Sequence, residues 1–64
     1  LLTMITIKIT ELGNNMIGFY IFNESNQLYK KFRRGKKDKQ AHIDRLTRIF
    51  MNSGKSIVFN DQTI

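Results

Sequence analysis

Residues 5–10 read Ile-Thr-Ile-Lys-Ile-Thr, and this strict alternation of apolar and polar residues decides the fold class. A period of two places the isoleucines on one face of a strand and the threonines and lysine on the other. The β-branched side chains also suit a pleated backbone. The stretch therefore predicts a strand with one buried face and one solvated face.

Working outward, Gly13-Asn14-Asn15 comes next, and because these residues tolerate positive φ they predict a hairpin. The following strand, residues 16–22, is apolar on both faces, which predicts a central position in the sheet. Its two alternating sets are Ile17, Phe19 and Ile21 on one face and Met16, Tyr20 and Phe22 on the other.

Residues 28–34 fit two structures. Leu28, Lys30 and Phe32 alternate as in an edge strand, where an inward lysine prevents pairing with another sheet. Leu28, Tyr29 and Phe32 also have helical spacing, with Gly35 in the position of a C-terminal glycine. The polar turn that precedes them favours the strand, and the helix stays the alternative.

Residues 39–52 predict an amphipathic helix. Asp38 is placed to cap its first turn, Asp44 and Arg48 form an i, i+4 pair, and Gly54 ends it. Its apolar stripe is Ile43, Leu46, Ile49 and Phe50.

A short last strand, residues 56–59, follows, with Ile57 and Phe59 on one face. The predicted fold is α+β: a small antiparallel sheet of three to four strands on one helix, in the order β-β-β-α-β, with a helix as the alternative third element. We expect residues 1–64 to form a single domain, with residues 1–3 upstream of a natural start at Met4 and residues 60–64 as a flexible tail.

The composition predicts an intracellular, cytoplasmic protein. The 64 residues include no cysteine, so disulfides and thiolate metal sites are excluded. The longest apolar run, residues 16–22, is far below the roughly 20 residues that cross a bilayer, so we expect no membrane partner.

Basic side chains are concentrated in one segment, residues 30–48, which carries nine cations and two acids, while the rest of the chain has a net charge of −1. A one-sided cluster of this kind is typical of a surface that binds phosphates, because each neutralised phosphate releases counterions. The predicted phosphate contacts are Lys30, Lys31, Arg33, Arg34, Lys36, Lys37, Lys39, Arg45 and Arg48. The alternative is a solvated face that keeps a small protein in solution.

Catalytic chemistry is not predicted. The single histidine, His42, and five scattered acids form no motif, so we expect no enzyme, no metal site and no cofactor. His42 lies one residue before the apolar stripe, which is typical of a half-exposed helical residue rather than a metal ligand.

The first functional hypothesis is a small non-catalytic nucleic-acid-binding protein, with DNA or RNA as the partner. Tyr20, Phe22 and Tyr29 are candidates for stacking on bases if the open face of the sheet is the binding face. The same aromatics also fit a core or the contact surface of a homodimer, and these alternatives stay open.

A basic loop follows the strands that contain Gly18-Phe19-Tyr20-Ile21-Phe22 and Leu28-Tyr29-Lys30-Lys31-Phe32, and an amphipathic helix follows the loop. In this order, residues 18–50 resemble the N-terminal three-stranded-sheet-plus-helix domains of tyrosine recombinases, whose sheet enters the DNA major groove. The strand predicted after the helix departs from that plan, so no binding residues are transferred.

The second functional hypothesis is a compact phage-type inhibitor, antitoxin or anti-defence protein. Its basic face would bind an acidic host protein or a nucleoprotein complex. The small size of the chain and the lack of catalytic groups suit this class as well as the first. The richness in Asn, Lys and Ile, which accompanies the first hypothesis, is typical of an AT-rich genome such as that of a phage or a low-GC bacterium.

Overall fold

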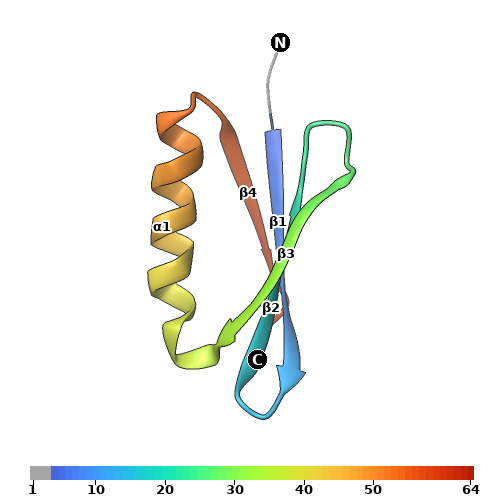
Figure 1. The fold of residues 1–64 in the computed structure, drawn as a ribbon, viewed down its shortest axis with the longest axis vertical. Coiled ribbons are helices and arrows are strands. Elements are labelled where there is room, and N and C mark those ends of the chain that lie inside the picture. Colours follow the sequence, from blue (N-terminus) through green and yellow to red (C-terminus); the bar gives the residue numbers. More distant parts are fainter. Residues whose placement is uncertain (1–3) are drawn as a thin grey trace.

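A computed structural model describes residues 4–64 and contains one sheet and one helix. Its elements are β1 (Met4–Gly13), β2 (Met16–Phe22), β3 (Leu28–Gly35), the 3-10 turn η1 (Lys36–Asp38), α1 (Lys39–Asn52) and β4 (Ser56–Asp61). The helix α1 lies along one face of the sheet (Figure 1). The predicted α+β class is confirmed, and residues 28–34 form a strand. The prediction for residues 1–3 lies outside the described residues.

The sheet is mixed, with the strand order β3-β2-β1-β4. β2 pairs antiparallel with both β1 and β3, as expected for a central strand. β4 pairs parallel with β1, so that Ile5 lies opposite Ile57 and Ile7 opposite Phe59. The prediction of a wholly antiparallel sheet is wrong for this pair. A helical connection from β3 to the opposite edge lets β4 run parallel to its neighbour, which a hairpin does not allow.

The predicted hairpin between β1 and β2 is confirmed. Asn14 and Asn15 both have positive φ, at 53° and 60°, as the central residues of a type I′ turn require. Leu12 is an extra residue in β1, where the pairing register shifts between Glu11 and Gly13.

The core lies between the sheet and α1. Its buried side chains are Ile5, Ile7, Ile9, Ile17, Phe19, Ile21 and Leu46. The Phe19 ring stacks on the Phe32 ring of β3, with 5.0 Å between the centroids. Of the two apolar faces of β2, the face with Phe19 is therefore the one that α1 covers. Tyr20 and Phe22 lie half-buried on the open face.

The ends of α1 differ in how well the sequence predicts them. Gly54 has a φ of +75°, and the N–H groups of Gly54 and Lys55 donate to the carbonyls of Met51 and Phe50, which completes a Schellman motif. Asp38 occupies the N-cap position, but its side chain makes no capping hydrogen bond. With φ −97° and ψ 10°, Asp38 lacks the extended backbone that directs a side chain back to the helix.

Two further contacts depart from the sequence prediction. Asp44 accepts a hydrogen bond from Gln40 at 3.0 Å, and the ion pairs within residues 4–64 do not include the predicted pair with Arg48. Such exposed pairs are weak, so a neighbour one turn earlier can replace them.

The end of the chain lies against β1. β4 continues to Asp61, past the predicted end of the strand, and the N–H of Gln62 donates to the carbonyl of Ile9 at 2.8 Å. The N–H of Ile64 donates to the Glu11 carboxylate at 3.0 Å. The mobility of the tail in solution stays a prediction. Within residues 4–64, α1 is too short and too polar to cross a bilayer.

Candidate nucleic-acid interface

The edge strand β3 carries four cations that alternate between the two faces of the sheet. Lys31 lies opposite Tyr20 on the open face, and Arg33 shares that side. Lys30 and Arg34 lie on the side that faces α1. All four are exposed, and the ion pairs within residues 4–64 involve none of them. β3 therefore presents positive charge on both of its sides.

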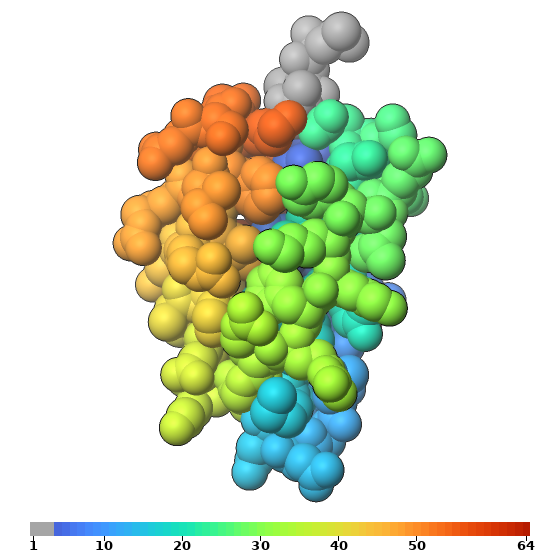
Figure 2. Space-filling model, viewed as in Figure 1, coloured from blue at the N-terminus to red at the C-terminus, as the bar shows by residue number. Residues whose placement is uncertain are grey.

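A groove of about 200 Å³ separates β3 from α1. Figure 2 shows it as a shallow hollow between the green side chains of β3 and the yellow and orange side chains of α1. Its floor is apolar and includes Phe32, Leu46 and Phe50. Lys30, Arg34 and Arg45 place three positive charges around it. The two predicted groups of cations, on the strand and on the helix, meet here.

Both arginines of the groove are held by aromatic neighbours. The Arg34 guanidinium lies 4.7 Å from the centroid of the Phe32 ring, a cation–π contact, and donates a 2.7 Å hydrogen bond to the carbonyl of Arg33. Arg45 lies 3.1 Å from Nδ1 of His42. Because arginine can only donate, Nδ1 is the acceptor in this contact.

His42 is a packing residue of the helix face. Its ring meets Phe19 edge-on at 5.9 Å and Phe32 at 6.4 Å between centroids. Burial lowers the pKa of His42 below its usual 6.5, and the charges of Arg45 and Arg34 lower it further against the opposing effect of Asp38. The imidazole is thus kept neutral and able to accept from Arg45.

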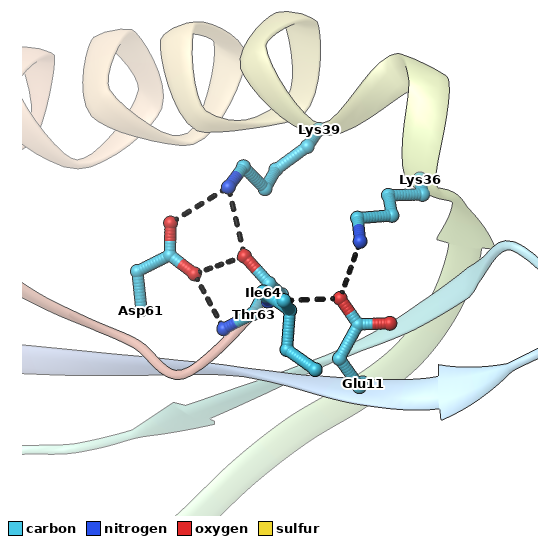
Figure 3. Close-up of polar contacts among 6 residues, drawn as sticks. All are labelled: Glu11, Lys36, Lys39, Asp61, Thr63 and Ile64. Carbon is cyan, nitrogen blue, oxygen red and sulfur yellow. Dashed lines mark hydrogen bonds and ion pairs between the residues drawn. The ribbon is translucent and has the colours of Figure 1, made fainter.

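Two of the predicted phosphate-binding lysines form ion pairs within the protein. Lys36 contacts the Glu11 carboxylate at 2.7 Å, and Lys39 contacts Asp61 at 2.8 Å. Lys39 also donates to the hydroxyl of Thr63 at 2.8 Å, and together these contacts join η1 and α1 to β1 and the end of the chain (Figure 3).

The pKa values of the acids reflect these pairs. The hydrogen bond from Lys36, aided by the backbone N–H of Ile64, lowers the pKa of Glu11. The hydrogen bonds from Lys39 and Thr63 lower the pKa of Asp61 to about 2. Both carboxylates are therefore ionised at neutral pH and hold their lysines by charge.

A third pair, Lys55 with Glu24 at 3.2 Å, leaves Asp38 and Asp44 as acids without an ion pair in the described part of the chain. Three of the 11 basic side chains form ion pairs with three of the five acidic ones within residues 4–64. Eight basic and two acidic side chains therefore have no ion pair there. Arg48 and Lys37 belong to the eight and are exposed, on α1 and η1 respectively. Arg48 lies outside the set of groove-lining residues.

The open face of the sheet holds a second basic cluster. Lys8, Tyr20 and Lys31 lie side by side across β1, β2 and β3, and Arg33 follows opposite Gly18. A hollow of about 360 Å³ adjoins Tyr20, Lys31 and Arg33. Sequence reasoning missed Lys8 as a site residue, although the alternation of residues 5–10 already put it on the wet face.

The three aromatic candidates do not share a face. Tyr20 and Phe22 lie two residues apart on the open side of β2. Tyr29 is an extra residue at the irregularity where β3 pairs with Ile21 and Phe22, and it lines the groove toward α1. A bulge of this kind interrupts the alternation of sides along a strand, so counting back by twos from Lys31 would wrongly place Tyr29 on the open face.

No protein-family model, no curated protein and no solved structure matches the chain. Within residues 4–64, no group of three His, Cys, Asp or Glu side chains gathers where a metal ion could be held.

Proposed function

We propose that this chain is a small non-catalytic protein that binds nucleic acid through phosphate contacts along β3. The observation that carries the proposal is the set of exposed cations Lys30, Lys31, Arg33 and Arg34, which have no acidic partner among residues 4–64. Four such charges in five residues form an edge that a polyanion can follow on either side. Arg45 extends it across the groove.

The arrangement of the acids also supports this proposal. Glu11, Glu24 and Asp61 are held by lysines outside β3, so they do not neutralise the edge strand. A surface serving only solubility has charges of both signs interspersed. Arg33 and Arg34 can each make two parallel hydrogen bonds to one phosphate. Lys36 and Lys39 are weaker candidates for phosphate contacts, because each would have to break its ion pair with Glu11 or Asp61.

A salt titration tests the proposal directly. Fluorescence anisotropy of labelled DNA and RNA should show affinity that falls with salt, with a log–log slope of about 0.9 per phosphate contact on duplex DNA or about 0.7 on a single strand. Arg33→Glu should weaken binding strongly. Arg48→Glu makes the same charge change at a predicted contact on α1 outside the groove, and we expect it to weaken binding less. Equal losses in the two variants, or no measurable binding, would contradict the proposal.

A second candidate is a protein-binding inhibitor that acts on an acidic protein or a nucleoprotein complex. Tyr29 and Ile49, on the rim of the groove, support it, because 68% and 47% of their surfaces are exposed beside three cations. An interface with an apolar centre and a charged rim tolerates salt better than phosphate binding does. Capture of a partner that survives high salt and is lost in Tyr29→Ala would favour this candidate.

A further inference from the structure

The open face of the sheet combines an aromatic ring with cations on both sides. Tyr20 lies between Lys8 of β1 and Lys31 of β3 in one cross-strand row. Directly opposed side chains in a sheet have Cβ atoms about 5 Å apart, so both ammonium groups can reach a strand that crosses the ring. Arg33 belongs to the next row, opposite Gly18.

Gly18 allows Tyr20 to lie low over the sheet. A Cβ atom built at Gly18 would come within 3.0 Å of Cε1 of the Tyr20 ring and 3.3 Å of the Thr10 hydroxyl oxygen. The ring therefore occupies the space above the glycine and is only half-buried. The hollow lined by Tyr20, Lys31 and Arg33 adjoins it.

The groove beside α1 lacks a comparable platform. The Phe32 ring has Phe19 stacked on it at 5.0 Å and the Arg34 guanidinium 4.7 Å from its centroid. These neighbours already use the Phe32 ring. Tyr29, on the rim of the groove, is exposed beside three cations, but it is an extra residue of β3 and has no cross-strand partner. Tyr20 is the aromatic side chain that lies between cations on both neighbouring strands.

We propose that the open face binds single-stranded nucleic acid, with a base stacked on Tyr20 and phosphates held by Lys8, Lys31 and Arg33. This inference rests on the proposed function and adds the class of ligand. In a duplex the bases are paired and stacked on one another, whereas unpaired bases can stack on an aromatic side chain. The cations complement the phosphates of the nucleic-acid backbone. The Tyr20 ring between them needs an unpaired base, so the face favours a single strand over a duplex.

The first test uses the unmodified protein and ligands of equal length. Single-stranded DNA, single-stranded RNA, duplex DNA and an abasic single strand with the same phosphates are compared by fluorescence anisotropy. We expect the abasic strand to bind about 5- to 150-fold more weakly than the strands with bases, which is the range that one stacked base contributes. Equal affinity for abasic and base-carrying strands overturns the inference and leaves phosphate binding intact. Failure of every ligand to bind instead overturns the proposed function.

The second test removes the ring. Tyr20→Leu keeps an apolar side chain above Gly18, and we expect it to bind the base-carrying strand as weakly as the abasic one. Tyr20→Phe should bind normally. Tyr29→Leu removes the exposed ring on the other side of the sheet and should still bind the base-carrying strand more tightly than the abasic one. Loss of that difference in Tyr29→Leu, with the difference kept in Tyr20→Leu, would overturn the inference. Circular dichroism confirms that each variant is folded. Normal binding by folded Tyr20→Leu overturns the inference.

A spectroscopic measurement reports the stacking itself. The chain has two tyrosines and no tryptophan, so Tyr29→Phe leaves Tyr20 as its only tyrosine. We expect a base-carrying strand to quench this fluorescence and an abasic strand to leave it unchanged. Light scattering provides the last check, because it measures whether the free protein is a dimer. If the protein is a dimer and Tyr20→Leu is a monomer, the open face binds a second copy of the chain and the inference is overturned.

Discussion

Two neighbouring stretches of the basic segment, residues 30–34 and 36–39, are both rich in cations and have different surroundings. In β3, Lys30, Lys31, Arg33 and Arg34 are exposed and have no acidic partner within residues 4–64, whereas Lys36 and Lys39 contact Glu11 and Asp61 at 2.7 and 2.8 Å. The acids that make this difference lie in β1 and at the end of β4. The comparison teaches that cations of a basic run stay unpaired, and so available to an anionic ligand, only where the fold brings no carboxylate to them.

The largest expected effect separates the two stretches by affinity. Lys31→Gln combined with Arg33→Gln should weaken nucleic-acid binding on the order of 50-fold at 0.1 M salt, because two phosphate contacts on the open face are lost. Lys36→Gln combined with Lys39→Gln removes the same charge and should cost only a few-fold. Anisotropy titrations at matched salt give both values. Similar losses would mean that net charge, and not position, controls binding.

A smaller effect comes from releasing the paired lysines. Glu11→Gln combined with Asp61→Asn frees Lys36 and Lys39, so we expect affinity for nucleic acid to rise a few-fold and the salt slope to become steeper. The Glu24→Gln variant removes an acid whose partner, Lys55, is not one of the predicted phosphate contacts, and serves as a control. No change in slope would show that the two lysines lie outside the path of the ligand.

The same ion pairs predict that the free energy of unfolding decreases at low pH. The pKa of Asp61 falls from its usual 3.8 to about 2 in the folded protein, so its stabilising contribution is complete above pH 3.8 and is lost as the pH falls toward 2. Urea unfolding at pH 5 and pH 2.5 measures it. The stability lost between pH 5 and pH 2.5 should be smaller in Lys39→Gln than in the natural chain. In Asp61→Asn the part of it that comes from residue 61 should be absent. The pair is exposed, so we expect Lys39→Gln to cost about 1 kcal/mol or less at pH 7.

The smallest effect concerns His42, which lies between the cations of β3 and α1. Burial lowers its pKa below 6.5, so the stability that its neutral form contributes is complete above pH 6.5 and is lost as the pH falls from 6.5 through the lower pKa of the folded protein. Arg34 and Arg45 disfavour the charged form, and Asp38 favours it. Unfolding free energies at pH 7.5 and 5.5 should differ slightly in the natural chain and less in His42→Gln. An equal difference in both would place the titration elsewhere.

Local patterns predicted most of the fold. The alternation of residues 5–10 correctly placed three isoleucines in the core, and the apolar stripe correctly predicted α1. The direction of β4 could not be predicted, because a strand pattern is the same for parallel and antiparallel pairing. Two details also escaped prediction: the Asp38 side chain makes no capping hydrogen bond, and Asp44 accepts from Gln40. Exposed polar contacts differ little in energy, so sequence does not fix them.

The candidate site was predicted in part. The cations of β3 follow directly from their positions in the chain, and their division between two faces follows from the period of a strand. Tyr29 was grouped with Tyr20 and Phe22, and the bulge puts it beside the groove instead. Lys8 joins the open face because β1 and β2 pair in a register that brings it beside Tyr20.

By itself, the sequence determined the periodicities: which residues alternate, which form a helical stripe, and where positive charge is dense. These are local properties, because each depends on neighbours within one or two turns of backbone. Only the tertiary structure decided which lysines meet a carboxylate and which aromatic ring stays accessible between cations. Those outcomes depend on strand order, register and direction, which are set by packing the whole chain around one core.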